Sequence, residues 1–193
     1  MADLKPITVP AAAEGFEYIR RFWDESAQVV TAKILPGQCY VTQQQEVMTT
    51  VLGSCVTACI RDPEAQVGGM NHFMLPLQYG SVGVSRADTI GSALCYGNWA
   101  MEYLLKSIFK LGGRKERLEI KLFGGGRVLT GITYIDIGQQ NIQFVLEYLM
   151  EEGLKVVAQD MGGIYPRKIL YCPLSGHVKM KKLKVVGARE LVK

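Results

Sequence analysis

The sequence predicts an α+β fold built from mixed β-sheets. Two β-rich segments meet at a turn between residues 49 and 75, and two segments with helical periodicity lie around 93–111 and 142–149. Further short strands separate and follow these helices. A chain that combines β-hairpins with helices separated by strands is typical of the α+β class. A chain of 193 residues is long enough to bury one core of its own.

Residues 1–33 are expected to form an N-terminal extension, with the main domain covering residues 34–193. Apolar side chains in the extension fall near helical spacing at Phe16, Ile19, Phe22 and Trp23. We interpret them as a short amphipathic helix that packs on the body, because exposed aromatic side chains need a surface to cover them. Docking of a partner protein by this helix is the alternative.

A strand and a hairpin are expected next. The first strand of the domain is predicted at residues 39–41, after a turn. Residues 51–60 are rich in β-branched side chains, residues 61–64 contain the Asp and Pro of a turn, and residues 67–75 form a second strand. A Gly- and Ser-rich loop follows at 77–92, and its length indicates either a functional segment or a plain surface connection.

The second half of the chain is expected to alternate helices and strands. Apolar residues at steps of three and four predict a helix over 93–111, which Gly112 and Gly113 would end. The same periodicity predicts a second helix through 142–149, ended by Gly153. The expected strands are 118–123, 154–158, 168–172 and 177–186.

Composition indicates a soluble cytoplasmic protein. Hydrophobic residues make up 48% of the chain and charged residues 21%, and no apolar run approaches the ~18 residues that a membrane span requires. The N-terminus lacks the basic and apolar pattern of a secretory signal. Five cysteines, an odd number in a chain of this size, favour reduced thiols over a disulfide framework.

The net charge of +4 is concentrated near the C-terminus, in residues 179–193. Such a basic segment is either the solvated face of a strand or a contact for an acidic partner. We favour the strand, because apolar residues alternate with the lysines and no aromatic residues suited to stacking on single-stranded nucleic acid accompany them. Neither nucleic-acid binding nor membrane insertion is therefore expected.

Cys55 and His72 are the residues on which a catalytic hypothesis can be built. A cysteine attacks as a thiolate, and a neighbouring imidazole is the usual group that generates one at neutral pH. The two residues lie on the two strands of the expected hairpin and could face each other across it. Gly53 and Ser54, just before the cysteine, are the candidates for the oxyanion hole or for substrate binding.

A structural role for the same residues is the alternative. Cysteine is among the most buried residue types, and a histidine on an apolar strand is often a satisfied core residue. Cys59 is expected to be such an inert cysteine, and His177 to be structural or exposed. No metal site and no cofactor are expected, because the cysteines and histidines lack metal-ligand spacing, and Gly124-Gly125-Gly126 lacks the remainder of a phosphate-binding loop.

Several motifs in order resemble the CheD family of bacterial chemotaxis proteins, which deamidate glutamine side chains on chemoreceptors. The motifs are L-G-S-C-V followed by R-D-P, then G-G-M-N-H-F-M-L-P, K-L-F-G-G-G at 121–126, I-G-Q-Q-N at 137–141 and D-M-G-G at 160–163. The resemblance covers roughly residues 35–185. It implies one domain with helices packed outside a β core.

The resemblance also implies roles for individual residues. Cys55 matches the family's nucleophile, His72 its general base, and Thr49 the threonine that completes the triad. The implied reaction is hydrolysis of a glutamine side chain through a thioester, with the helical cytoplasmic domain of a chemoreceptor as substrate and a CheC-type phosphatase as a further partner. A non-enzymatic adaptor that binds receptors or the phosphatase is the main alternative, and transglutamination or ester hydrolysis by the same pair is another.

Overall fold

Two five-stranded sheets form the body of the protein. The computed structural model describes residues 8–77, 93–128 and 136–184. The first sheet, here sheet A, has the strand order β1 (Arg20–Asp24), β2 (Val29–Lys33), β4 (Glu46–Leu52), β9 (Arg167–Tyr171) and β10 (Val178–Lys182). The second, sheet B, has the order β3 (Gln38–Thr42), β6 (Val67–His72), β5 (Val56–Asp62), β7 (Glu119–Gly124) and β8 (Val156–Met161). Both sheets are mixed, because β2–β4 and β7–β8 are parallel and the other pairs are antiparallel.

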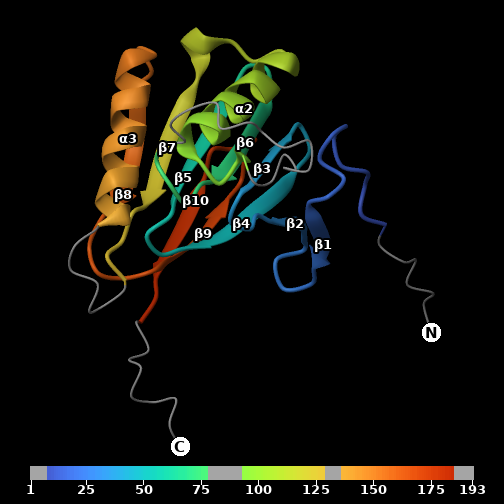
Figure 1. The fold of residues 1–193 in the computed structure, drawn as a ribbon. Helices are drawn as coiled ribbons and strands as arrows, with labels where there is room; N and C mark the ends of the chain where they lie inside the picture. The colour runs from blue at the N-terminus through green and yellow to red at the C-terminus, as the bar shows by residue number, and fades with distance from the viewer. Residues whose placement is uncertain (1–7, 78–92, 129–135, 185–193) are drawn as a thin grey trace, which may run out of the picture.

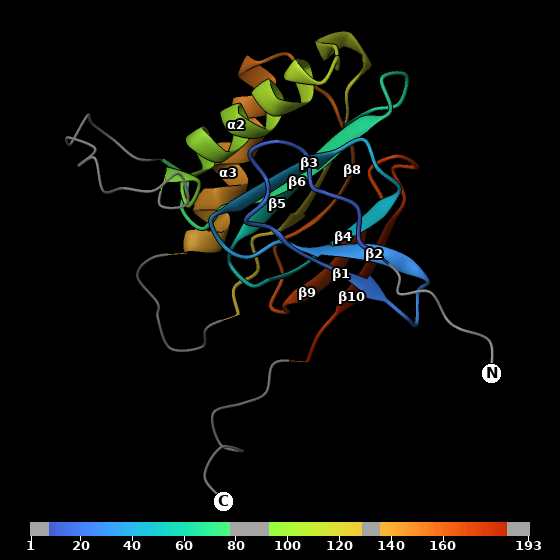
Figure 2. The same cartoon turned by 90° about the vertical axis from the view of Figure 1, so that its right-hand side faces the viewer.

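In the part of the chain that the structure describes, two helices cover the outer face of sheet B. They are α2 (Gly97–Lys110) and α3 (Ile137–Glu151), and a single 3₁₀ turn, η1 (Lys115–Arg117), precedes β7. Figure 2 shows the resulting layers, with the helices on one side of sheet B and sheet A on the other. The expected α+β class, with helices outside a β core, is therefore confirmed.

The side chains of β6 point alternately into the space between sheet B and the helices and into the space between the two sheets. Successive residues of a strand point to opposite faces. Asn71 points toward the helices, where its Nδ2 lies 3.4 Å from the sulfur of Met101 on α2. His72 points toward sheet A, where its Nδ1 lies 2.8 Å from Thr50 Oγ1 on β4. The histidine is thus placed in the space between the sheets.

The predicted hairpin is confirmed in its turn and pairing, but the expected first strand, 51–60, is divided between β4 of sheet A and β5 of sheet B, and the second strand ends at His72. Strands β5 and β6 pair antiparallel, from Cys59 opposite Met70 to Asp62 opposite Val67. The turn is held by the Asp62 carboxylate, which accepts the N–H of Glu64 at 2.9 Å and that of Ala65 at 3.0 Å. Asp62 thus stabilises the turn by bonding to nearby backbone N–H groups, as expected for an aspartate in a turn.

The expected N-terminal helix is wrong. Arg20–Asp24 forms strand β1, which pairs antiparallel with β2. The Asp24 carboxylate closes the turn between them by accepting the N–H of Ser26 at 2.9 Å. This region therefore contributes two strands, β1 and β2, to sheet A, and the strand expected first, 39–41, is the third. Phe16 and Ile19 are buried in the core instead of lining a helix.

Most later elements lie where the sequence places them, with shifted ends. α2 begins at Gly97 and not at 93, and α3 begins at Ile137, where the Asp136 side chain caps it by accepting the N–H of Gln139 at 3.0 Å. The Gly- and Ser-rich loop falls almost wholly on residues 78–92, outside the described residues, as does the end of the basic segment, 185–193. On β10 the lysines are exposed, which agrees with a solvated strand face.

Candidate active site

Cys55 lies in the short connection between β4 and β5, and three consecutive carbonyl oxygens hold this connection in place. Gly53 O accepts the N–H of Gly126 at 2.8 Å, and Cys55 O accepts the N–H of Gly125 at 2.8 Å. Between them, Ser54 O accepts Nδ2 of Asn141, on α3, at 3.0 Å. We call residues 53–55 the cysteine turn. Its sulfur-bearing residue is only partly buried, so a substrate can approach it.

Glycine is required where the end of β7 meets the cysteine turn. Gly124 has a φ of 114° and Gly125 a φ of 67°, which side-chain-bearing residues rarely adopt. A Cβ on Gly124 would overlap the carbonyl oxygen of Cys55. The glycine run therefore serves close approach of backbone to the cysteine turn. The sequence reading of these glycines as residues for a tight turn or close approach, and not as a phosphate loop, agrees with this geometry.

The hydrogen bonds of His72 define which of its nitrogens carries a proton. Thr50 Oγ1 lies 2.7 Å from Ile34 O and 2.8 Å from His72 Nδ1. A hydroxyl has one hydrogen, and the carbonyl can only accept, so Thr50 donates to Ile34 O and accepts from Nδ1–H. The other nitrogen, Nε2, then carries the lone pair. It is buried and has no hydrogen-bond partner among the described residues.

The electrostatic environment keeps His72 neutral. Its side chain is 1% exposed, and burial lowers its pKa to about 4, although the Ile34 carbonyl acts in the opposite direction. The imidazole is consequently unprotonated at pH 7. A neutral imidazole with an unshared lone pair on Nε2 is the form in which histidine acts as a general base.

Cys55 and His72 fall on the same face of sheet B. Val56 and Phe73 are paired in an antiparallel bridge, and the Phe73 ring packs against Phe144 on α3. Alternation places the preceding residues, Cys55 and His72, on the other side, toward sheet A. Such diagonal neighbours in a ladder have Cα atoms about 7–8 Å apart, within reach of each other's side chains. In the resting structure no hydrogen bond joins the two.

The Cys55 thiol is protonated at rest. Burial raises the pKa of Cys55 above its usual value, its own N–H lowers it, and the nearby Cys95 thiol raises it again. Combined with the neutral His72, this gives a thiol and imidazole pair in place of a preformed ion pair. Nucleophilic attack by this sulfur would require its proton to move to the nitrogen first or at the same time.

The threonine expected beside the imidazole is displaced by one residue. Thr49 points away from His72: its hydroxyl donates to Ile169 O on β9 at 3.0 Å, and its carbonyl accepts the N–H of Ile34 at 2.9 Å. Thr50, the next residue of β4, makes the contact with His72 instead. A one-residue shift along a strand exchanges the two faces, so only one of the two threonines can face sheet B.

The expected oxyanion candidates lie in the cysteine turn. The carbonyls of Gly53, Ser54 and Cys55 are all occupied, whereas the N–H groups of Ser54 and Cys55 donate to no backbone or side-chain oxygen in the described part of the chain. The Cys55 N–H lies close to its own sulfur. Free N–H groups beside a nucleophile are what an oxyanion hole requires.

Other residues singled out from the sequence lie away from this site or in inert positions. Cys59 is fully buried, and burial raises its pKa far above the usual value. His177 is exposed on the connection between β9 and β10. Within residues 8–77, 93–128 and 136–184, no three His, Cys, Asp or Glu side chains are grouped as metal ligands.

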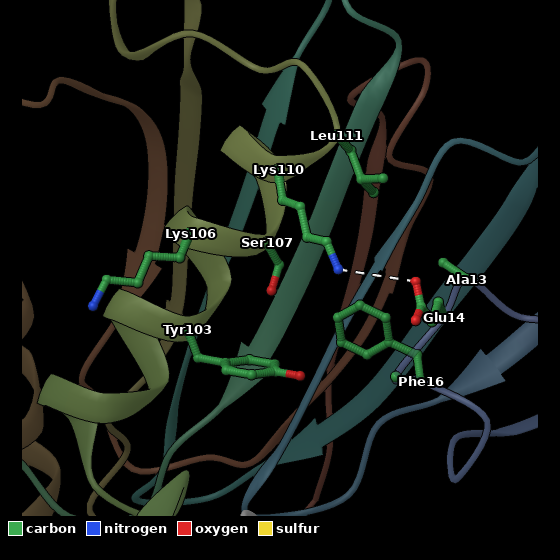
Figure 3. Close-up of a pocket in the computed structure, with 9 residues that line it drawn as sticks. Ala13, Glu14, Phe16, Tyr103, Lys106, Ser107, Lys110 and Leu111 are labelled. Atoms are coloured by element: carbon green, nitrogen blue, oxygen red, sulfur yellow. Dashed lines mark ion pairs between the residues drawn. The ribbon is translucent and has the colours of Figure 1, made fainter.

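A cavity of about 460 Å³ lies apart from the cysteine turn, between residues 13–16 and α2. Figure 3 shows Tyr103 and Phe16 on its walls, with Lys110 extended toward Glu14, whose carboxylate is 4.0 Å from the lysine Nζ. None of the residues that line this cavity belongs to the cysteine turn or contacts His72. It therefore adds nothing to the site described above.

Two residues that contact His72 or the cysteine turn were not expected from the sequence. Thr50 could have been found from strand alternation, had the buried face of β4 been known. Asn141 lies in the I-G-Q-Q-N motif, yet nothing in that motif shows that a side chain of a distant helix reaches the cysteine turn. Its two hydrogen bonds, to Ser54 O at 3.0 Å and Met74 O at 2.8 Å, exist only in the folded chain.

The fold and the site define a class: a two-sheet α+β protein with a cysteine and a neutral histidine on one face of a sheet. The model of the family described as CheD chemotactic sensory transduction matches residues 74–182. The chain belongs to the CheD family. No helix among the described residues is long and apolar enough to cross a membrane.

Curated relatives cover nearly the whole chain, including the cysteine turn and His72. The chain is 53% identical to a protein of Saccharophagus degradans over 100% of this chain and 86% of the relative. It is 51% identical to a protein of Halorhodospira halophila, over 92% of this chain and 81% of the relative. It is 48% identical to a protein of Hahella chejuensis, over 95% of this chain and 84% of the relative. Each of these relatives is named "Probable chemoreceptor glutamine deamidase CheD".

Proposed function

We propose that this protein hydrolyses glutamine side chains of chemoreceptors to glutamate, with Cys55 as the nucleophile and His72 as its base. The observation that carries the proposal is the hydrogen-bonded series Ile34 O, Thr50 Oγ1 and His72 Nδ1, which leaves a neutral Nε2 on the face of sheet B that Cys55 shares. The names of the relatives supply the substrate class.

The reaction begins with proton transfer. His72 Nε2 takes the proton of the Cys55 thiol as the sulfur attacks the side-chain carbonyl carbon of the glutamine, and a tetrahedral intermediate forms. The imidazolium gives this proton to the amide nitrogen, the C–N bond breaks, and ammonia leaves a thioester on Cys55. Water, deprotonated by His72, attacks the thioester. The products are glutamate and the regenerated thiol, so one water is consumed for each ammonia released.

Thr50 takes the role that was assigned to Thr49. Its hydroxyl keeps Nδ1 protonated and the ring in one orientation, as a carboxylate does in other triads. A threonine carries no charge, and it stabilises imidazolium less than an aspartate would. This suits a base whose pKa is low and whose charged state lasts only for the proton transfer.

The developing oxyanion meets the N–H groups of the cysteine turn. Ser54 and Cys55 are the donors that the hydrogen bonds of the turn leave free, and Gly53 gives the turn its close approach to Gly126. A preorganised donor is worth about 10²–10³ in rate. The substrate would be a glutamine on the helical cytoplasmic domain of a receptor, which also implies a cytoplasmic location. A CheC-type phosphatase as partner stays a prediction.

The test is mass spectrometry of a receptor cytoplasmic fragment incubated with the wild-type protein and, separately, with Cys55→Ala. We expect a gain of about one mass unit at a defined glutamine with the wild type and none with the variant, because the thioester cannot form without the sulfur. A fragment that binds but stays unchanged would favour the adaptor. Adding a primary amine separates transglutamination, which would incorporate the amine, from hydrolysis.

A further inference from the structure

Asn141 connects helix α3 to both segments that border the nucleophile. Its side chain is fully buried, and its Nδ2 donates to Ser54 O, directly before Cys55, at 3.0 Å, and to Met74 O, in the segment after β6, at 2.8 Å. Both neighbours are carbonyl oxygens, which can only accept, so the amide orientation follows from the network. Figure 1 shows α3 beside sheet B, with its N-terminal end reaching the level at which β7 ends.

The acceptor end of the same side chain is left without a partner. Asn141 Oδ1 is buried and has no hydrogen-bond donor among the described residues. A buried amide oxygen without a donor destabilises the fold. An apolar residue would avoid this cost at a position packed into the core. The side chain is therefore better explained by what its NH₂ group does for the cysteine turn.

Asn141 determines which way the Cys55 N–H points. The carbonyl and the N–H of a trans peptide unit point in opposite directions. Because Ser54 O is directed at α3, the N–H of Cys55 is directed away from α3. This agrees with the effect of that N–H on the sulfur, whose pKa it lowers. Loss of the Asn141 contact would leave the peptide unit between Ser54 and Cys55 free to rotate.

We propose that Asn141 is a positioning residue for the deamidation reaction, which orients the Ser54–Cys55 peptide so that the Cys55 N–H stabilises the oxyanion. The inference rests on the proposed function, since it takes Cys55 as the nucleophile. Asn141 touches neither the substrate nor the sulfur. It acts through the backbone of the cysteine turn, and its second bond, to Met74 O, fixes the turn relative to the segment that follows His72.

The experiment uses Asn141→Leu, which fills the same space, and Asn141→Ala, which leaves room for water. The matched control is Val145→Ala, because Val145 is fully buried one turn further along α3 and makes no bond to the cysteine turn. Deamidation of the receptor fragment is followed by ammonia release to obtain kcat and KM. The rate of Cys55 alkylation by iodoacetamide is measured against pH, with the modified peptide identified by mass. Thermal melting establishes that each variant is folded.

We expect kcat to fall about 10²-fold in both Asn141 variants, with KM within about threefold, as for loss of one oxyanion donor. Alkylation of Cys55 should keep its pH profile, because attack on iodoacetamide develops no oxyanion. Val145→Ala should retain kcat within about threefold. Equal losses in deamidation and alkylation would overturn the proposal, as would Asn141 variants no slower than Val145→Ala. A different result, deamidation that survives in Cys55→Ala, would contradict the proposed function itself.

Discussion

Two adjacent threonines with opposite orientations illustrate how one residue position decides a role. Thr49 bonds to Ile169 O within sheet A, whereas Thr50 reaches across to His72 on sheet B. Both are β-branched and both suit a strand, so their chemistry does not distinguish them. What distinguishes them is the face of β4 on which each one lies.

Thr50→Val is predicted to lower kcat for glutamine deamidation by about 10–100-fold, because the imidazole loses the group that orients it and selects its tautomer. Thr49→Val is the matched control, with the same change one residue earlier on the strand, and should stay within about twofold. Steady-state ammonia release from a receptor fragment measures both. A larger loss in Thr49→Val than in Thr50→Val would show that Thr49, as the family resemblance implies, is the threonine that supports the imidazole.

The low pKa of His72 makes stability depend on pH. The unfolded histidine titrates at 6.5 and the folded one at about 4, so between these values only the unfolded state binds the proton. The contribution of His72 to the free energy of unfolding is therefore fully present above pH 6.5 and is lost as the pH falls toward 4. The loss attributable to this residue is about 3 kcal/mol.

Urea unfolding at pH 7 and pH 4 measures this effect, with His72→Gln as the reference. The wild type should lose about 3 kcal/mol more than the variant between the two pH values, because the variant has no proton to bind at this position. Other groups titrate in both proteins and cancel in the comparison. Equal losses would mean that His72 is not held neutral in the fold.

At the scale of elements, Glu46 links three strands from the two sheets. Its carboxylate is fully buried and accepts hydrogen bonds from Tyr40 and Thr42 of β3, each at 2.6 Å, and from Arg21 of β1 at 2.8 Å. The residue itself belongs to β4. The network fixes β3, in sheet B, against β1 and β4, in sheet A, and so holds together the sheets that present Cys55 and His72.

Glu46→Ala is predicted to reduce the free energy of unfolding by about 3–5 kcal/mol, because it leaves the nearly buried Arg21 without its counter-ion. Glu119→Ala is the control: its ion pair with Arg61 is partly exposed and should contribute at most about 1 kcal/mol. Denaturant unfolding at pH 7 compares the two. Similar losses in both variants would show that the buried network is no more important than a surface pair.

At the scale of the whole molecule, residues 8–33 pack into the same body as the rest of the described chain. Strand β2 pairs parallel with β4 from Val30 opposite Glu46 to Lys33 opposite Thr49. Phe16 and Ile19 are 4% and 5% exposed, and the Phe16 ring contacts Tyr40 and Tyr103. Removing this region would expose the edge of β4, the strand that carries Thr50.

A fragment of residues 34–193 is therefore predicted not to unfold cooperatively, since it lacks two strands of sheet A and the Arg21 partner of Glu46. Calorimetry of the fragment beside the full chain tests this. A sharp transition within a few degrees of that of the full chain would show that residues 1–33 are an accessory extension after all.

The sequence by itself determined the fold class, the β5–β6 hairpin and the family, because turn residues, strand and helix periodicity and motif order are local signals. It also placed Cys55 close to the strand that pairs with the strand of His72, although Cys55 itself lies just before β5 and not on it. Their joint action stays a prediction, as do the roles of Gly53 and Ser54 in the oxyanion hole. Local pattern misassigned Phe16, Ile19, Phe22 and Trp23 to one helix, because their spacing resembles a helical period although the first two precede β1 and only the last two lie on it.

Only the tertiary structure decided what depends on contacts between distant segments. Thr50 faces His72 because β4 of one sheet lies against β6 of the other, a relation between two sheets that no local pattern contains. Asn141 reaches Ser54, 87 residues away in the sequence, because α3 packs on sheet B. Burial, which lowers the pKa of His72, is likewise a property of the assembled layers. The residue types of the site come from the sequence, and their orientation and protonation come from the packing around them.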